Sequence, residues 1–144
     1  MVKYAKWAGY ILGLFMVAMG AMKFFGDVPI FMLLENNLAS KYGLELSFID
    51  PGFKYFTGAL ELIAGGLLLF GQRLKGGLLS IFVIGGALLS HIFVLGISTP
   101  MSAEAGAEKS PMLFIMAVIF FVISLWVTWG AKQADAKPVK SRTE

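Results

Sequence analysis

The sequence predicts an all-α integral membrane protein, a four-helix bundle, and two observations lead to this prediction. The chain of 144 residues is 58% hydrophobic with a mean hydropathy of +0.78, whereas soluble domains are about 45–50% apolar. Four segments are apolar over roughly the 20 residues that a transmembrane helix needs, at about 7–25, 53–70, 76–97 and 112–128. These spans use most of the chain, so we expect a single membrane domain.

The first span follows Lys3 and Lys6 and covers residues 7–25. Its apolar run exceeds the about 7–15 residues of a signal-peptide core, so we expect an uncleaved transmembrane helix. Gly9 and Gly13 form a G-x-x-x-G pair, a spacing that lets two helix backbones approach closely. The first span is therefore predicted to pack through this glycine face.

Residues 26–52 form the longest connection between spans. Asp27 and Pro29 are typical of a helix start, and the apolar residues 30–34 precede a polar stretch. The segment is too short to cross a bilayer and too apolar for a free loop. We therefore predict a short amphipathic helix between spans one and two, either lying in the membrane interface or capping the bundle. The Asp-Pro-Gly sequence at 50–52 predicts a turn before the second span.

Spans two and three are joined by a short turn that contains Arg73 and Lys75, which predicts an antiparallel helical hairpin. Both spans contain paired or regularly spaced glycines, which are typical of close helix packing in membranes. The predicted helix-packing glycines are Gly9, Gly13, Gly58, Gly65, Gly66, Gly85 and Gly86.

The fourth span follows a small polar loop that begins after Ser98-Thr-Pro100, and Pro111 is expected to open it. Residues 131–144 form a polar, basic tail, a composition that predicts disorder. The formal net charge is +3, and the basic residues lie beside the spans instead of forming one patch. We therefore expect the lipid bilayer as a partner and no nucleic acid.

The distribution of charge predicts the orientation, because short cytoplasmic loops carry an excess of lysine and arginine. One side of the predicted bundle carries most of the basic residues: Lys3, Lys6, Arg73, Lys75, Lys132, Lys137, Lys140 and Arg142. The other side carries most of the acidic residues: Asp27, Glu35, Glu45, Asp50, Glu104 and Glu108. We predict that both termini are cytoplasmic and that the 26–52 and 98–111 loops face outward.

Lys23, Glu61 and His91 are ionisable residues inside the predicted spans. A charge at membrane depth costs about 2.5–3.5 kcal/mol on insertion scales, so each needs a partner or a function. Gly58, Glu61 and Gly65 are three and then four residues apart, so they share one helical face and turn the carboxyl inward. At 1.5 Å per residue, Lys23, Glu61 and His91 lie roughly 24, 18 and 22 Å from the cytoplasmic boundary. We predict that they converge as a ligand or proton site.

Several roles remain open for these three residues. Lys23 and Glu61 could form a buried ion pair beside which His91 bonds or titrates. The cluster would hold a polar head group, relay protons to a redox cofactor, or only fix the register of the helices. One histidine and no cysteine exclude bis-histidine haem and thiolate chemistry within one chain. Glu61 and His91 alone are too few ligands for zinc, so no metal site is predicted.

Three stretches resemble the DoxX family of small four-helix membrane proteins: Met19-Gly-Ala-Met-Lys-Phe-Phe25, Gly58-Ala-Leu-Glu-Leu-Ile-Ala-Gly-Gly66 and the turn at Gly71. The resemblance covers about Ala8 to Trp129 and implies a bacterial inner-membrane protein. Members similar to this chain include a subunit of a thiosulfate:quinone oxidoreductase, accessory proteins encoded with redox or maturation systems, and eukaryotic relatives that assist receptor assembly or cargo export. The absence of cysteine argues against a thiol-based redox role.

We therefore expect an accessory protein, not an enzyme by itself, that serves a membrane or periplasmic partner through a polar pocket at Lys23, Glu61 and His91. The alternative is a quinone-linked oxidoreductase subunit of the thiosulfate:quinone type, in which Glu61 and His91 carry protons and Lys23 holds an anionic substrate. A third reading is a small proton or lipophile carrier. Four helices of one copy form a narrow conduit, so this carrier would act as a homo-oligomer.

Overall fold

The computed structural model describes residues 2–101 and 106–136. The helices are α1 (Val2–Phe25), α2 (Ile30–Tyr42), α3 (Lys54–Leu69), α4 (Arg73–Ser90) and α5 (Met112–Asp135). Two π-helical turns extend them: η1 (Ile49–Phe53) precedes α3, and η2 (His91–Leu95) follows α4. Two short strands, β1 (Thr99–Pro100) and β2 (Lys109–Ser110), pair antiparallel.

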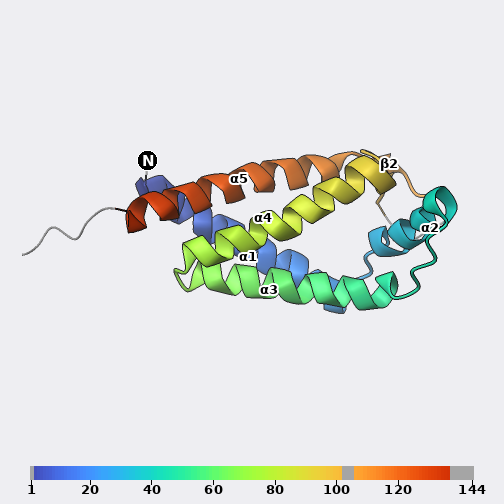
Figure 1. Cartoon of the computed structure of the whole chain (residues 1–144), viewed down its shortest axis with the longest axis horizontal. Coiled ribbons are helices and arrows are strands. Elements are labelled where there is room, and N and C mark those ends of the chain that lie inside the picture. The colour runs from blue at the N-terminus through green and yellow to red at the C-terminus, as the bar shows by residue number, and fades with distance from the viewer. Residues whose placement is uncertain (1, 102–105, 137–144) are drawn as a thin grey trace, which may run out of the picture.

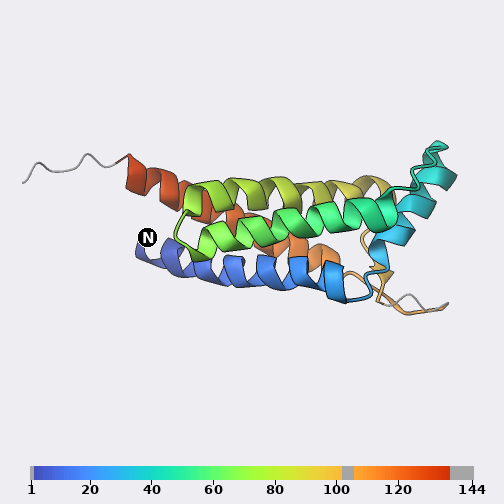
Figure 2. The same cartoon turned by 90° about the horizontal axis from the view of Figure 1, so that it is seen from below.

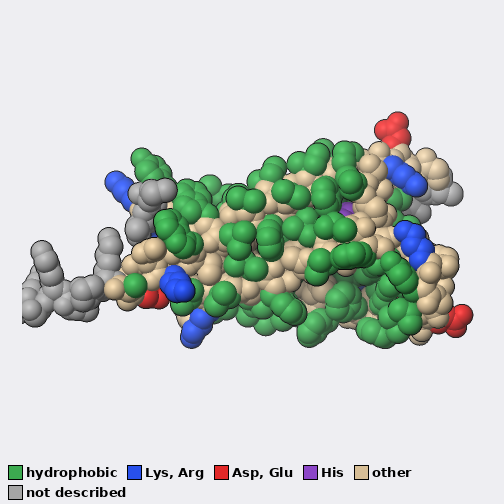
Figure 3. Space-filling model, turned by 45° about the horizontal axis from the view of Figure 1, so that its top comes forward, with side chains coloured by type: hydrophobic (Ala, Val, Ile, Leu, Met, Phe, Trp, Pro, Cys, Tyr) green, Lys and Arg blue, Asp and Glu red, His purple; other side chains and the backbone are tan. Residues whose placement is uncertain are grey.

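The predicted all-α class is confirmed, and each of the four predicted spans lies on a helix of membrane-spanning length. Within the described chain, four helical segments are long and apolar enough to cross a membrane: Lys3–Phe25, Ile49–Leu69, Arg73–Leu95 and Met112–Asp135. Apolar side chains cover the flank of the molecule, whereas charged side chains gather toward its two ends (Figure 3). A soluble bundle rarely exposes apolar patches of this size, but a multi-pass membrane protein presents such a flank to lipid.

The four long helices form an antiparallel ring in which chain neighbours are also spatial neighbours. Helix α1 packs against α3 and α5, and α4 packs against the same two helices (Figures 1 and 2). The start of α1, the α3–α4 turn and the end of α5 lie together, and we call this the terminal end. Helix α2, η1 and the β1–β2 hairpin lie at the opposite end, which we call the cap end.

The core of the bundle is built largely from small and aliphatic residues of the four long helices. Its buried members are Ala8, Leu12, Met16, Ala64, Leu68, Ile84, Ala117 and Val127. Between α1 and α5, the rings of Phe15 and Phe120 stack with their centroids 3.5 Å apart. The small residues let the helix backbones approach each other closely. Such close packing is what associates helices in a membrane, where lipid supplies no hydrophobic driving force.

Glycines bring the backbones of α1 and α3 into close contact. A Cβ atom on Gly65 would lie 2.7 Å from the carbonyl oxygen of Gly13, and one on Gly20 would lie 2.8 Å from that of Gly58. No side chain fits at such distances, so the two backbones touch directly. Both helices place these glycines seven residues apart, which is about two turns and keeps them on one face. Seven-residue spacing therefore makes α1 and α3 a closely packed antiparallel pair.

Gly66 and Gly86 face away from the other helices of the described chain. Nothing in the described chain lies within 4 Å of a Cβ atom placed on Gly66 or Gly86. Each follows a glycine that does make the contact, and successive helical residues point about 100° apart, so Gly66 and Gly86 turn away. For Gly85 the nearest atom is 3.3 Å away, on Phe121, and for Gly9 it is 3.4 Å away, on Arg73. The closest approaches that the prediction omitted, besides Gly20, are at Gly76, Gly77 and Gly130.

Helix α2 caps the bundle, which is one of the two placements that the sequence left open. Asn37 Nδ2 and Lys41 Nζ donate to the carbonyl of Val94 at 3.1 and 2.9 Å, and the Tyr42 hydroxyl donates to that of Phe93 at 2.9 Å. The last carbonyls of a helix have no partner within it and need one. Helix α2 supplies donors to them, and a lysine there also matches the negative end of the helix dipole.

Helix α2 is also connected to the start of α3. Glu35 Oε2 accepts a hydrogen bond from the backbone N–H of Asp50 at 3.2 Å, and Lys54 Nζ lies 3.2 Å from Asp50 Oδ1. Asp50 has non-helical backbone angles, so the chain turns at this position before α3 begins, where the sequence predicted a turn. Beneath α2 lies a second apolar cluster of Phe31, Leu34, Ile49 and Val94. The cap is therefore a packed part of the fold.

The last segments differ from the prediction in two places. The connection between α4 and α5 contains the β1–β2 pair, and strands of two residues are too short for a periodic sequence signal. Helix α5 continues to Asp135, beyond residue 128 and into the predicted tail. Its last turns pack on α1, since a Cβ atom on Gly130 would lie 2.6 Å from Ala5 Cβ. The rest of the tail, with Lys137, Lys140 and Arg142, and the loop residue Glu104 lie outside the described residues.

Candidate functional site

Lys23 of α1 and Glu61 of α3 form a buried ion pair inside the bundle. Lys23 Nζ lies 2.5 Å from Glu61 Oε2, and the two side chains are 8% and 11% exposed. The sequence predicted that these residues converge, and the structure places them in direct contact. Each charge in the apolar interior thus has a counter-charge, which offsets its cost of burial.

The glycines of the α1–α3 interface position this pair. Gly20 precedes Lys23 by three residues and Gly58 precedes Glu61 by three, so each glycine shares a helical face with a charge. A Cβ atom on Gly58 would lie 3.0 Å from Lys23 Cβ, and this close approach of the two helices brings the charges within hydrogen-bond distance. The ammonium also donates to the Met19 carbonyl at 3.4 Å.

His91 makes its hydrogen bond apart from Lys23 and Glu61. Its side chain is buried, 3% exposed, and Nδ1 lies 3.0 Å from the carbonyl oxygen of Gly96. A carbonyl only accepts, so Nδ1 carries the hydrogen. The N–H of Gly96 donates back to the His91 carbonyl at 2.8 Å, and the His91 ring meets that of Phe114 edge-on at 5.8 Å. None of the hydrogen bonds or ion pairs of the described residues joins His91 to Lys23 or Glu61.

A small cavity opens beside Lys23, toward the cap end. Its volume is about 130 Å³ and its lining is Met19, Met22, Lys23, Asp27, Val28, Pro29, Ile30, Pro100, Met101 and Leu113. Most of these side chains are apolar, and neither Glu61 nor His91 is among them. Small-molecule sites usually have about 300–1,000 Å³, so this cavity has room for a fragment of a ligand only.

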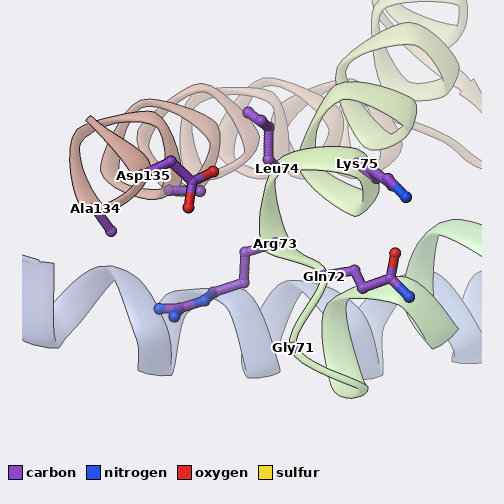
Figure 4. A pocket seen from close by; sticks show the side chains of 8 residues that line it. Gly71, Gln72, Arg73, Leu74, Lys75, Ala134 and Asp135 are labelled. Atoms are coloured by element: carbon purple, nitrogen blue, oxygen red, sulfur yellow. The ribbon is translucent and has the colours of Figure 1, made fainter. Parts of the chain in front are cut away.

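A second cavity lies at the terminal end, and the sequence analysis did not identify it. Its volume is about 280 Å³, and it is lined by Gly71, Gln72, Arg73, Leu74, Lys75, Ala131, Ala134 and Asp135 (Figure 4). The available signal was the basic turn at Arg73 and Lys75, which predicted a helical hairpin and the orientation but no cavity. A sequence does not show that the end of α5 comes to lie opposite this turn.

Within residues 2–101 and 106–136, no three histidine or carboxylate side chains lie close enough together to hold a metal ion. In comparisons with protein-family models, curated protein sequences and solved structures, nothing matches this chain. The function is therefore inferred from the residues of the chain and from the two cavities.

Proposed function

We propose that this chain is a DoxX-like, multi-pass accessory protein of a bacterial inner membrane that serves a partner complex and is not an enzyme by itself. The observation that carries the proposal is the buried pair of Lys23 and Glu61 between two membrane-length helices. These two residues lie in the two longest stretches that resemble the family. Ionisable residues at membrane depth are functional candidates by default.

The geometry favours the accessory role over a quinone-linked oxidoreductase. An oxidoreductase subunit would need proton-carrying side chains that line a pocket large enough for a quinone ring. Lys23 and Glu61 instead bind each other at 2.5 Å, and His91 is bonded to Gly96. The cavity beside Lys23 has a volume of about 130 Å³, which is below the usual range for small-molecule sites. This geometry therefore supports an accessory role more than a catalytic one.

We place the terminal end in the cytoplasm and the cap end on the outer side of the membrane. The support is the positive-inside rule together with the position of the basic residues. Lys3 and Lys6 start α1, Arg73 and Lys75 start α4, and Lys132 lies in the last turn of α5. All of these lie at the terminal end. A partner that meets α2 and the β1–β2 hairpin would then be a membrane or periplasmic protein.

Native mass spectrometry of the tagged chain in lipid nanodiscs, prepared from its own host, tests the proposal. The expected spectrum shows a constant protein mass in addition to whole multiples of the 15.6 kDa chain, and no small ligand that depends on Glu61. The same preparation should not reduce quinone when thiosulfate is supplied. A bound quinone or anion that disappears in Glu61→Gln, together with thiosulfate-driven quinone reduction, would replace the accessory role with the oxidoreductase alternative.

A further inference from the structure

The cavity at the terminal end lies between the first residues of α4 and the last residues of α5. The α3–α4 turn and the start of α4 supply one wall, and Ala131, Ala134 and Asp135 of α5 supply the other (Figure 4). Both helices are long and apolar enough to cross a membrane, and Arg73 and Asp135 are the end residues of those segments. In a bilayer spanned by these helices, the cavity would lie near the level of the lipid head groups.

Arg73 is the main cationic group of this cavity. Its aliphatic stem lies against α1, because a Cβ atom on Gly9 would be 3.4 Å from Arg73 Cδ. In Figure 4 its guanidinium extends along α1 on the side of Asp135, whereas Lys75 points to the other side of the turn. The ion pairs of the described residues are Lys23–Glu61 and Lys54–Asp50. No described carboxylate thus lies within ion-pair distance of Arg73.

The backbone at the start of α4 adds further positive potential. Gly76 donates to the carbonyl of Gln72, the residue before α4, at 2.9 Å, and the Gln72 side chain makes no capping hydrogen bond. The amides of residues 73–75 therefore precede the helical hydrogen bonds, and such amides favour anions. Gly71 has a φ of 85°, which a glycine adopts without strain, so the turn is tight enough to bring these groups together.

We propose that this cavity binds the phosphate head group of an anionic phospholipid, such as phosphatidylglycerol. Guanidinium groups bind phosphate oxygens through two parallel hydrogen bonds, and basic pockets between membrane helices hold acidic head groups. The acyl chains would run along the bundle over Leu78 and Trp129, which are 54% and 49% exposed and lie further toward the membrane centre. This lipid site requires membrane insertion only, and neither the accessory role nor the family.

Native mass spectrometry of the purified full chain in detergent, titrated with phosphatidylglycerol or phosphatidylcholine of equal chain length, tests the proposal. We expect the first phosphatidylglycerol to bind several-fold more tightly than phosphatidylcholine. Arg73→Gln should weaken phosphatidylglycerol binding by about fivefold, since a basic residue near a lipid surface contributes about 1 kcal/mol. Asp135→Asn, which removes the opposing charge from the same cavity, should strengthen binding by a similar factor.

Lys109→Gln is the matched control, because it removes one exposed positive charge at the cap end and should leave both affinities unchanged. Lys75→Gln is a second test, on an exposed residue of the same cavity, and should also weaken phosphatidylglycerol binding. A folding defect of Arg73→Gln therefore cannot conceal the loss of lipid binding. Equal affinity for the two lipids, or equal losses in Lys109→Gln and Arg73→Gln, would overturn the proposal. Inorganic phosphate at millimolar concentration separates the sources: displacement of the lipid by phosphate, with the same dependence on Arg73, would make the site one for soluble phosphate.

Discussion

Replacing Lys23 and Glu61 singly and together measures what the buried ion pair contributes to the bundle. We consider Lys23→Met, Glu61→Leu and the double variant, which keep side-chain length or volume and remove charge. The two groups lie 2.5 Å apart with side chains 8% and 11% exposed. Each single substitution therefore leaves one buried charge without its partner, and the double substitution leaves none.

The magnitudes follow from this geometry. At 2.5 Å and an effective dielectric constant of about 20, the attraction is about 7 kcal/mol. Burying two ions costs several kcal/mol each, so the intact pair contributes close to nothing in net stability. Removing one partner should cost about 3–5 kcal/mol, consistent with the about 3 kcal/mol cost of a lone charge at membrane depth. The double variant should return to within about 1 kcal/mol of the native free energy of unfolding.

Reversible unfolding in mixed micelles by increasing SDS, followed by the fluorescence of the three tryptophans, provides the free energies. The cycle should show a coupling of more than about 3 kcal/mol between the two positions, as expected for one buried charge pair. If the double variant is as unstable as the sum of the two single variants, the charges are not paired and the reasoning is wrong. A stable double variant also separates folding from function, because it can be tested for its partner without its charges.

Three further predictions follow from the fold. Gly65→Ala should lower the free energy of unfolding by about 1–3 kcal/mol, because its Cβ atom would lie 2.6 Å from a side-chain atom of α1. Gly66→Ala, with nothing within 4 Å of its Cβ atom, should not destabilise the protein. Equal losses of stability in SDS unfolding would contradict this packing. Lys41→Met removes a donor to the end of the third span and should raise hydrogen exchange of the α2 amides by up to about tenfold; unchanged protection would argue against the cap. In this cysteine-free chain, an impermeant maleimide should label Lys75→Cys only from the cytoplasmic side and Lys109→Cys only from the outer side, and labelling of both from one side would refute the orientation.

The four long helices could be predicted from the sequence, because a membrane-spanning helix is determined by composition over about 20 residues. Each of the four segments has this apolar composition within its own residues. The turn at Asp50 and the helix that follows Pro29 were also readable, since proline and aspartate act on the backbone beside them. The extension of α5 was not, because it depends on the contact of Gly130 with Ala5, which lie at opposite ends of the chain. Composition alone classified those residues as a tail.

The candidate site shows the same division between local and distant information. Depth along a helix follows from residue count, and this count predicted similar levels for Lys23, Glu61 and His91. Rotation about the helix axis does not follow from residue count. His91 has Gly96 as its hydrogen-bond partner, five residues along the chain, which a depth estimate does not reveal.

By itself, the sequence determined the number and approximate positions of the membrane-length helices, the charge asymmetry between the two ends and the presence of an acid and a base inside the apolar segments. These properties depend on residue type and spacing along one chain segment. Only the tertiary structure decided that Lys23 meets Glu61, that Gly65 packs while Gly66 turns away, and that Arg73 lines a cavity with Asp135. The physical reason is that helices in an apolar medium are oriented by close contacts between neighbours, and those contacts join residues that are far apart in the sequence.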